Sequence, residues 1–200
     1  MLNTYKKISK CRICNSKNIY EYLNLGMQPL ANSFIKSKDI KFEKKFPLKM
    51  ILCKNCGLSF LSVTINPQII FNDYDYLSSS SKALINHYKK LTSNLCTTYQ
   101  IKKDDLILDI GCNDGILLNQ YTNKFKNLLG VEPSNASKLV NTKKIKLLNK
   151  FFNYNLSKEI KYNFGYPKLI TITNVFAHID DIKNFVKGLA NISNHETVIV

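Results

Sequence analysis

The sequence has very little arginine, few acidic residues and no long apolar run. Arg12 is the single arginine among 29 basic residues, which face only 14 acidic ones, and the formal net charge is +15. Such a charge favours an anionic partner, but proteins that read nucleic acid need the planar fork of arginine for bidentate contacts. Because the basic residues are almost all scattered lysines, we do not expect nucleic acid to be the partner.

Two further absences concern membranes and export. The sequence contains no apolar run near the about 20 residues that a membrane-spanning helix needs, and its N-terminus lacks the apolar core of a signal peptide. We therefore expect a cytoplasmic protein without a membrane segment. With 200 residues, of which 44% are hydrophobic, the chain is long enough for one or two domains with a buried core.

The segment 106–132 has the pattern of half a nucleotide-binding α/β unit. Residues 106–110 form a short apolar run typical of a strand buried on both faces, and the stretch from Gly111 to Gly115 interrupts it with a turn. Apolar residues at helical spacing follow, and a second apolar strand over 128–131 ends at Glu132. The distance from Gly111 to this acid is close to the spacing of about 20 residues expected in such units.

This arrangement predicts a ribose-containing ligand. Glycines let the backbone approach the ligand, amides at the helix start face it, and the acid after the second strand accepts both ribose hydroxyls. The turn reads Gly-Cys-Asn-Asp-Gly and lacks the middle glycine that a dinucleotide pyrophosphate requires. A ligand without pyrophosphate fits better, and S-adenosylmethionine is the commonest of these. The alternative is an α/β protein whose strand simply ends in a glycine turn.

Two cysteine pairs predict a structural zinc site. Cys11 and Cys14 form one pair, Cys53 and Cys56 the other, and two such pairs complete a four-sulfur shell around one metal ion. With four protein ligands the metal has no open position for substrate, so it should hold a small domain together. A redox role or a coincidence of spacing are the alternatives. We expect a β-rich zinc-binding domain over 1–65, with a packed loop at 23–34 and strands at 46–52 and 58–63.

Residues 66–100 are predicted to be a linker and a bridging helix. Ser78 to Ser81 supply candidate N-caps, and apolar residues from Leu84 to Leu95 recur at helical spacing. Tyr74 and Tyr76 lie just ahead of this helix, where core or interface packing is the alternative to a functional role. His87 is interpreted as a packed helix histidine.

Residues 101–200 are predicted to form a Rossmann-like α/β domain. Further strands are expected at 145–148, 169–173 and 197–200, and Asp180 or Asp181 should cap a helix with apolar residues from Ile182 to Ile192 on its buried face. Phe152, with Phe151 before it, follows the third strand, where a ring lies against the base in adenosine-binding domains; core packing explains it equally well. Because sheets of this class normally have further strands, we expect this domain to be incomplete at its C-terminus.

Several segments, taken together and in order, resemble one family: the S-adenosylmethionine-dependent C-methyltransferases that act on nucleotide-linked 4-keto-deoxysugars. The resemblance runs from about residue 11 to the end of the sequence. The matching segments are Cys11 to Cys14, the stretch 26–34 ending in PLANSF, FPL at Phe46, CKNCGL at Cys53, DYDYLSSSS at Asp73, His87, DIGCNDGILL at Asp109, GVEPSNAS at Gly130, FF at Phe151 and NVFAHIDDIKNFVKG at Asn174.

The resemblance implies a class I methyltransferase domain that binds S-adenosylmethionine and a zinc-binding N-terminal domain that helps enclose a nucleotide-sugar substrate. It also implies a C-terminal domain with a Tyr, Glu and His cluster, which this sequence does not contain. We therefore expect a fragment, a split gene product or a chain partnered by a separately encoded C-terminal half.

The resemblance also assigns residues to roles. His178 and Tyr76 are expected to act in catalysis, and Tyr74 and Ser79 to contact the substrate. A positioned base would remove a proton next to the ketone, and the enolate would attack the sulfonium methyl in line. For His178, a helix-start histidine without a role is the alternative. The expected cofactor-binding residues are Asp109, Gly111, Asn113, Asp114, Gly115, Glu132, Phe152 and Asn174.

Two other functions are compatible with parts of the sequence. A zinc-containing RNA methyltransferase suits the basic charge, but such enzymes often carry an Asn/Asp-Pro-Pro-Tyr/Phe loop where this sequence reads Asn174-Val-Phe-Ala-His178. A non-catalytic module that binds the cofactor without turnover is the second alternative.

Overall fold

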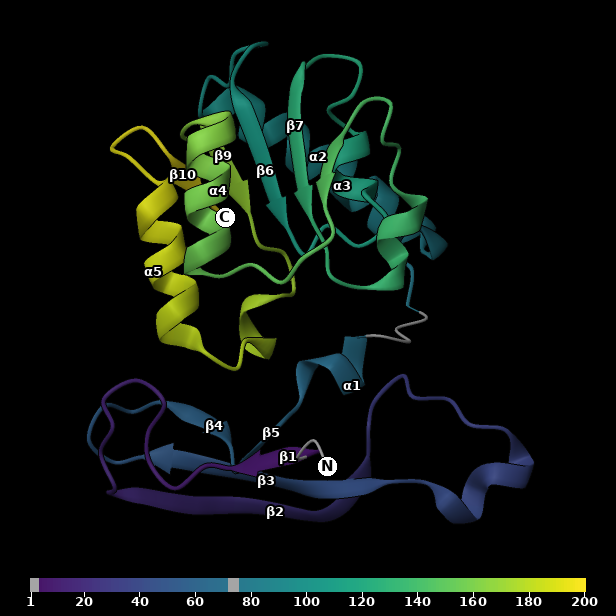
Figure 1. Ribbon diagram of the computed structural model, residues 1–200, viewed down its shortest axis with the longest axis vertical. Coiled ribbons are helices and arrows are strands. Elements are labelled where there is room, and N and C mark those ends of the chain that lie inside the picture. The colour runs from purple at the N-terminus through teal and green to yellow at the C-terminus, as the bar shows by residue number, and fades with distance from the viewer. Residues whose placement is uncertain (1–3, 72–75) are drawn as a thin grey trace. The chain divides into compact units, whose positions relative to one another are not determined.

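The computed structural model describes residues 4–71 and 76–200. These two ranges belong to two compact units, which divide between residues 74 and 75 (Figure 1). Within the described ranges, every helix is too short or too polar to cross a bilayer. Each unit is described by itself below.

The first unit is β-rich and is built around its cysteines. A three-stranded antiparallel sheet has the order β2-β3-β4, and a separate antiparallel pair joins β1 to β5. Its main buried cluster consists of Cys11, Ile51, Cys53 and Phe60. The elements of this unit are β1 (Tyr5–Lys7), β2 (Ile19–Pro29), η1 (Ser37–Phe42), β3 (Lys45–Cys53), β4 (Ser59–Leu61), β5 (Val63–Ile65) and α1 (Pro67–Phe71).

The prediction of a loop at 23–34 is wrong for residues 23–29, because strand β2 continues to Pro29. The register of β2 against β3 shifts between Glu21 and Leu23 and again between Asn24 and Met27. These bulges, one of which holds Gly26 at φ +72°, break the regular alternation by which a strand is recognised. The strand predicted at 46–52 is confirmed as β3, whereas 58–63 contains parts of two short strands.

The second unit is a doubly wound α/β sandwich. Its five-stranded sheet has the order β10-β9-β6-β7-β8, and every pairing is parallel. One face packs against α2 and α3, and the other against α4 and α5 (Figure 1). The strands are β6 (Leu106–Ile110), β7 (Asn127–Val131), β8 (Lys146–Leu148), β9 (Leu169–Thr171) and β10 (Val198–Ile199). The helices are η2 (Ser78–Ser80), α2 (Lys82–Thr98), α3 (Ile116–Asn119), η3 (Asn135–Leu139), α4 (Tyr154–Phe164), η4 (Phe176–His178) and α5 (Ile182–Ile192).

Side-chain caps set the starts of the longer helices. Ser81 accepts a hydrogen bond from the Leu84 amide at the start of α2 (3.3 Å), and Asp181 caps α5 as predicted. The sequence predicted α2 as a bridge, but it belongs to the second unit, where Tyr88 and Leu95 are buried in the core. Helix α3 is shorter than its apolar spacing suggested, because the chain tightens into i→i+3 bonds after Asn119.

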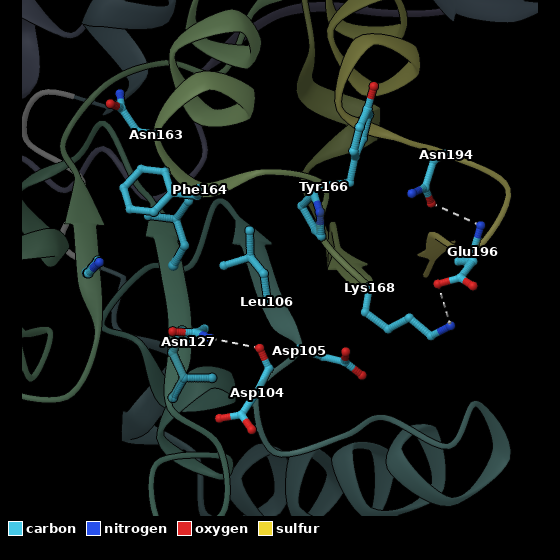
Figure 2. Close-up of a pocket in the computed structure, with 14 residues that line it drawn as sticks. Asp104, Asp105, Leu106, Asn127, Asn163, Phe164, Tyr166, Lys168, Asn194 and Glu196 are labelled. Carbon is cyan, nitrogen blue, oxygen red and sulfur yellow. Dashed lines mark hydrogen bonds and ion pairs between the residues drawn. The ribbon is translucent and has the colours of Figure 1, made fainter.

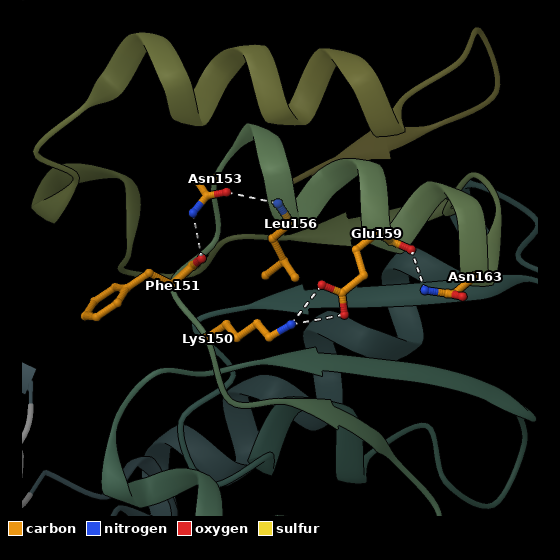
Figure 3. Close-up of polar contacts among 6 residues, drawn as sticks. All are labelled: Lys150, Phe151, Asn153, Leu156, Glu159 and Asn163. Atoms are coloured by element: carbon orange, nitrogen blue, oxygen red, sulfur yellow. Dashed lines mark hydrogen bonds and ion pairs between the residues drawn. The ribbon is translucent and has the colours of Figure 1, made fainter.

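Helix α4 was not anticipated, although its start carries a clear capping residue. Figure 3 shows Asn153 accepting a hydrogen bond from the Leu156 amide (2.9 Å), and the Lys150 ammonium pairing with the Glu159 carboxylate on the exposed side (2.8 Å). Because β8 and β9 are parallel strands of one sheet, the connections that follow them both begin at the edge where the strands end.

Candidate functional site

The glycine turn lies at the carboxyl edge of the parallel sheet. The amide of Gly111 donates to the Val131 carbonyl oxygen (2.7 Å), which ties the end of β6 to the end of β7. Gly111 and Gly115 both have positive φ, +75° and +77°. A Cβ atom on Gly111 would collide with the side chain of Val175, so this position accepts only glycine. The turn therefore brings the chain back at the edge of the sheet where ligands of such folds bind, with most of its amides held by hydrogen bonds within the protein.

Glu132 is the centre of a hydrogen-bond network at this edge. Its Oε2 accepts from the Asn113 amide (2.9 Å), and its Oε1 accepts from the Ser134 amide (2.8 Å). The side chain is only 6% exposed. A carboxylate has about four lone-pair positions, so each oxygen retains capacity for one more donor. The carboxylate is thus preorganised by the backbone and still able to bind a diol.

Two polar residues that the sequence reasoning missed support Glu132. Asn149 Nδ2 donates to the Glu132 carbonyl oxygen (2.7 Å) and to Ser137 Oγ (2.8 Å). Ser134 caps the 3-10 helix η3 and is buried. The position of Asn149 could have been predicted, because this residue directly follows the strand predicted at 145–148. It therefore had to lie at the carboxyl edge of the sheet.

Asp109 is a second buried acid at the end of β6. Its Oδ1 accepts from Thr171 Oγ1 (2.6 Å), and the two residues are direct partners across the pairing of β6 with β9. The pKa of Asp109 is raised to about 7, mainly by burial and also by the charge of Glu132, while the hydrogen bond from Thr171 acts in the opposite direction. The sequence reasoning also missed Thr171, because its hydrogen bond to Asp109 depends on β9 lying beside β6 in the sheet.

The raised pKa of Asp109 predicts how the stability of the second unit changes with pH. Because the folded pKa lies above the ordinary value of 3.8, the contribution of this carboxyl is fully present below about pH 4 and is lost as the pH rises through about 7. Between pH 5 and pH 8 the wild type should lose about 2–3 kcal/mol more unfolding free energy than Asp109→Asn. Urea denaturation followed by helical circular dichroism measures this, since the three long helices belong to this unit.

The matched control for this prediction is Asp104→Asn. The Asp104 carboxylate is exposed, and the hydrogen bond and charge of Lys126 lower its pKa, so its removal should not flatten the pH profile. Equal pH profiles for the wild type and Asp109→Asn would contradict the assignment of a neutral Asp109 below pH 7.

The structure brings residues 76–79 onto the glycine turn. The Ser78 amide donates to Asn113 Oδ1 (2.9 Å), and the Ser79 amide donates to Asp114 Oδ2 (2.9 Å). Asn113 Nδ2 in turn donates to the Tyr76 carbonyl oxygen (3.0 Å). The Tyr76 side chain is 43% exposed, next to the turn. The expected substrate residue Tyr74 lies outside the described residues.

The remaining predicted site residues follow β8 and β9. Asn174 and His178 are exposed on the connection between β9 and α5, and Val175 between them reaches Gly111. Phe152 is buried in the core, where its ring packs edge-to-face on Phe185 at 5.1 Å. The accessible ring after β8 is that of Phe151, 41% exposed.

The four predicted metal-ligating cysteines lie together in the first unit. Their Sγ atoms all lie within 4.8 Å of one another, with Cys11 to Cys56 at 3.5 Å and Cys14 to Cys53 at 3.6 Å. Tetrahedral zinc with bonds of about 2.3 Å requires sulfur separations of about 3.8 Å, so the geometry fits zinc. The Ser16 backbone amide lowers the pKa of Cys14 to about 6, which favours the thiolate that binds metal.

The two cysteine pairs sit in matching turns. The amide of the residue after each pair, Asn15 or Gly57, donates to the carbonyl oxygen of the first cysteine at 3.1 and 2.9 Å. Both residues have positive φ, +59° and +76°. This repeated geometry aims two sulfurs of each turn at a common point. The sequence shows Gly57 at the second turn, but it does not show that Asn15 has the same conformation at the first.

A cavity of about 370 Å³ lies away from the glycine turn, at the amino ends of the strands (Figure 2). Its charged residues already pair with one another or with neighbours, as Lys168 does with Glu196 at 3.8 Å and Asp104 with Lys126 at 2.9 Å. Ligands of doubly wound sheets bind at the carboxyl ends instead. We therefore place the candidate site at the glycine turn and not in this cavity.

Comparison with known families matches both units. Residues 83–200 match a family described as "Methyltransferase domain", and residues 11–71 match one described as "Putative zinc binding domain". A curated relative, the C-methyltransferase NovU of Streptomyces niveus, is 27% identical over 192 residues. That alignment covers 95% of this chain and 46% of the relative, so the chain spans about half the length of the relative that it matches.

Two solved structures that resemble part of this chain are named as methyltransferases. An S-adenosylmethionine-dependent methyltransferase from Clostridium acetobutylicum is 23% identical with a TM-score of 0.46, covering 57% of this chain and 48% of that one. The plantazolicin methyltransferase BpumL, in complex with an analog and SAH, is 21% identical with a TM-score of 0.44, covering 56% and 44%.

Proposed function

Because the chain belongs to the methyltransferase family that its residues 83–200 match, we propose that it binds S-adenosylmethionine and takes part in methylating a carbon of a small molecule. The proposed acceptor is a nucleotide-linked 4-keto-deoxysugar. The observation that carries the proposal is the position of Glu132, held by two backbone amides beside a glycine turn at the carboxyl edge of the sheet.

The residues at this edge suit the cofactor. Glu132 has lone pairs left for the ribose diol, and the backbone of the turn from Gly111 to Gly115 would hold the amino-acid end. Three buried acids, Asp109, Asp114 and Glu132, gather here in a chain whose net charge is +15. The carboxylates of Asp114 and Glu132 supply most of the local negative charge, since Asp109 with its pKa of about 7 is only partly ionised near neutral pH, and this charge favours a ligand that carries a sulfonium cation. We assign the exposed ring of Phe151 to the adenine.

The proposed acceptor rests on the chemistry and on the relative. When bound, S-adenosylmethionine supplies an electrophilic methyl group, which calls for a carbon nucleophile in a C-methylation such as the name of the Streptomyces niveus relative states. A carbon next to a ketone becomes nucleophilic when a positioned base removes its proton. His178 and Tyr76 are the proposed groups for that proton, and both have exposed side chains on segments that reach the glycine turn.

The test is methyl transfer from labelled S-adenosylmethionine to a dTDP-4-keto-deoxysugar by the whole protein. We expect one methyl group per sugar, on carbon, with the rate reduced about 100-fold or more in His178→Gln and in Tyr76→Phe. Transfer to total RNA without transfer to the sugar would overturn the proposal in favour of the RNA methyltransferase. Cofactor binding without any transfer would overturn it in favour of the non-catalytic module.

A further inference from the structure

We propose that Asn113 and Asp114 are positioning residues that fasten segment 76–79 to the glycine turn and couple the place of Tyr76 to occupancy of the cofactor site. The inference rests on the proposed function for what occupies that site. It assigns the side chains of both residues to the segment, whereas the sequence interpretation assigned them to the cofactor.

Asn113 uses its backbone amide and both polar atoms of its side chain to connect two parts of the site. Its backbone amide donates to Glu132 Oε2 (2.9 Å), its Oδ1 accepts from the Ser78 amide (2.9 Å), and its Nδ2 donates to the Tyr76 carbonyl oxygen (3.0 Å). It is 9% exposed and has a φ of +52°, a conformation that asparagine tolerates better than most residues. This conformation turns the backbone amide toward Glu132 while the side chain reaches the segment.

Asp114 adds a second attachment with unused capacity. Its Oδ2 accepts from the Ser79 amide (2.9 Å), while its buried Oδ1 accepts no hydrogen bond from any residue in the described ranges. A buried acceptor without a partner costs free energy, so a small movement that brings a further donor onto Oδ1 is favoured. The Asp114 carboxylate therefore favours positions of segment 76–79 in which hydrogen-bond donors lie close to the glycine turn.

These contacts give a physical route from the cofactor site to Tyr76. A ribose diol on Glu132 would fix the carboxylate that also accepts from the Asn113 amide. Fixing Asn113 fixes both bonds that its side chain makes to the segment, at Tyr76 and at Ser78. Cofactor binding should therefore order the segment before an acceptor molecule arrives.

The experiment is amide hydrogen exchange of the folded protein, resolved residue by residue by NMR, with and without S-adenosylhomocysteine. Without ligand, the Ser78 amide should exchange about 10-fold faster in Asn113→Ala, and the Ser79 amide about 10-fold faster in Asp114→Ala. The control Ser80→Ala alters a hydroxyl in the same stretch that donates to the Leu77 carbonyl oxygen (2.7 Å) and not to the glycine turn, so both amides should keep their wild-type rates. Saturating ligand should slow both amides in the wild type but not in Asn113→Ala.

Two milder variants test the same contacts if an alanine variant does not fold. Asp114→Asn keeps a side-chain acceptor and should restore protection of Ser79. Asn113→Asp keeps the acceptor for Ser78 but loses the donor to Tyr76, so Ser78 should stay protected while ligand-induced slowing weakens.

The outcomes separate this inference from the proposed function. Wild-type exchange rates in both alanine variants would overturn the fastening. Ligand binding that leaves Ser78 and Ser79 unchanged in the wild type would overturn the coupling. Failure of the wild type to bind S-adenosylhomocysteine would overturn the proposed function and the coupling, while the ligand-free comparison would still decide the fastening.

Discussion

Removing the metal is expected to unfold the first unit while leaving the second folded. The core of residues 4–71 is small, and two of the four residues in its buried cluster are the cysteines Cys11 and Cys53. Strand β2 is exposed along most of its length and adds little apolar burial. Structural zinc contributes about 10–16 kcal/mol in small zinc domains, which exceeds the stability that so small a core supplies. The turns that aim the sulfurs should separate once the metal is gone.

The measurement combines metal analysis with NMR of the whole chain. We expect about one zinc per chain, and a strong chelator or Cys53→Ser should collapse the dispersed signals of residues 4–71 while those of 76–200 persist. The control is Cys96→Ser, which removes a partly buried thiol of the second unit that packs against its core and should leave the metal content unchanged. A metal-free protein with unaltered signals from the first unit would contradict a structural role.

Local signals in the sequence predicted much of the second unit. The apolar run of β6, the glycine turn and the acid after β7 lie within one short stretch of sequence. Their spacing along the chain was therefore enough to predict that they lie together. Helix α5 was predicted with a cap at Asp180 or Asp181, because an acid directly before an apolar stripe marks a helix start, and the structure shows the cap at Asp181. The four cysteines predicted to bind zinc are also local signals, since each pair lies within one turn, and the structure brings the two pairs together.

What the sequence did not show are relations between distant segments. The bond of Thr171 to Asp109 needs the strand order that puts β9 beside β6. The attachment of Ser78 and Ser79 to the glycine turn joins residues more than 30 positions apart and uses backbone amides, which every residue has. Phe152 shows that even neighbouring residues could not be told apart from the sequence. Two adjacent aromatics offered no means of deciding which ring is buried until the packing on Phe185 was known.

Replacing Glu132 should weaken S-adenosylhomocysteine binding by about 100-fold or more. Two hydrogen bonds from the ribose diol to a charged acceptor are worth about 1.5–3 kcal/mol each, and Glu132→Ala removes both. Alanine also deprives the Asn113 and Ser134 amides of their acceptor, so part of the loss would come from the turn itself. Glu132→Gln keeps one oxygen acceptor in place and should lose about 10-fold to 100-fold. Calorimetry measures both, with Glu159→Ala as control because its carboxylate pairs with Lys150 on the exposed side of α4 (Figure 3).

A cycle that changes the ligand as well as the protein separates direct contact from distortion of the turn. The 2′-deoxy analogue of S-adenosylhomocysteine lacks one of the two hydroxyls that Glu132 is proposed to accept. In the wild type this analogue should bind about 10-fold more weakly, whereas in Glu132→Ala it should bind as well as the parent compound, since the partner of the missing hydroxyl is gone. Groups in contact give such non-additive losses, and distant groups give additive ones. Equal penalties for the analogue in both proteins would place the ribose elsewhere, and the carboxylate would then serve only to hold the backbone of the glycine turn.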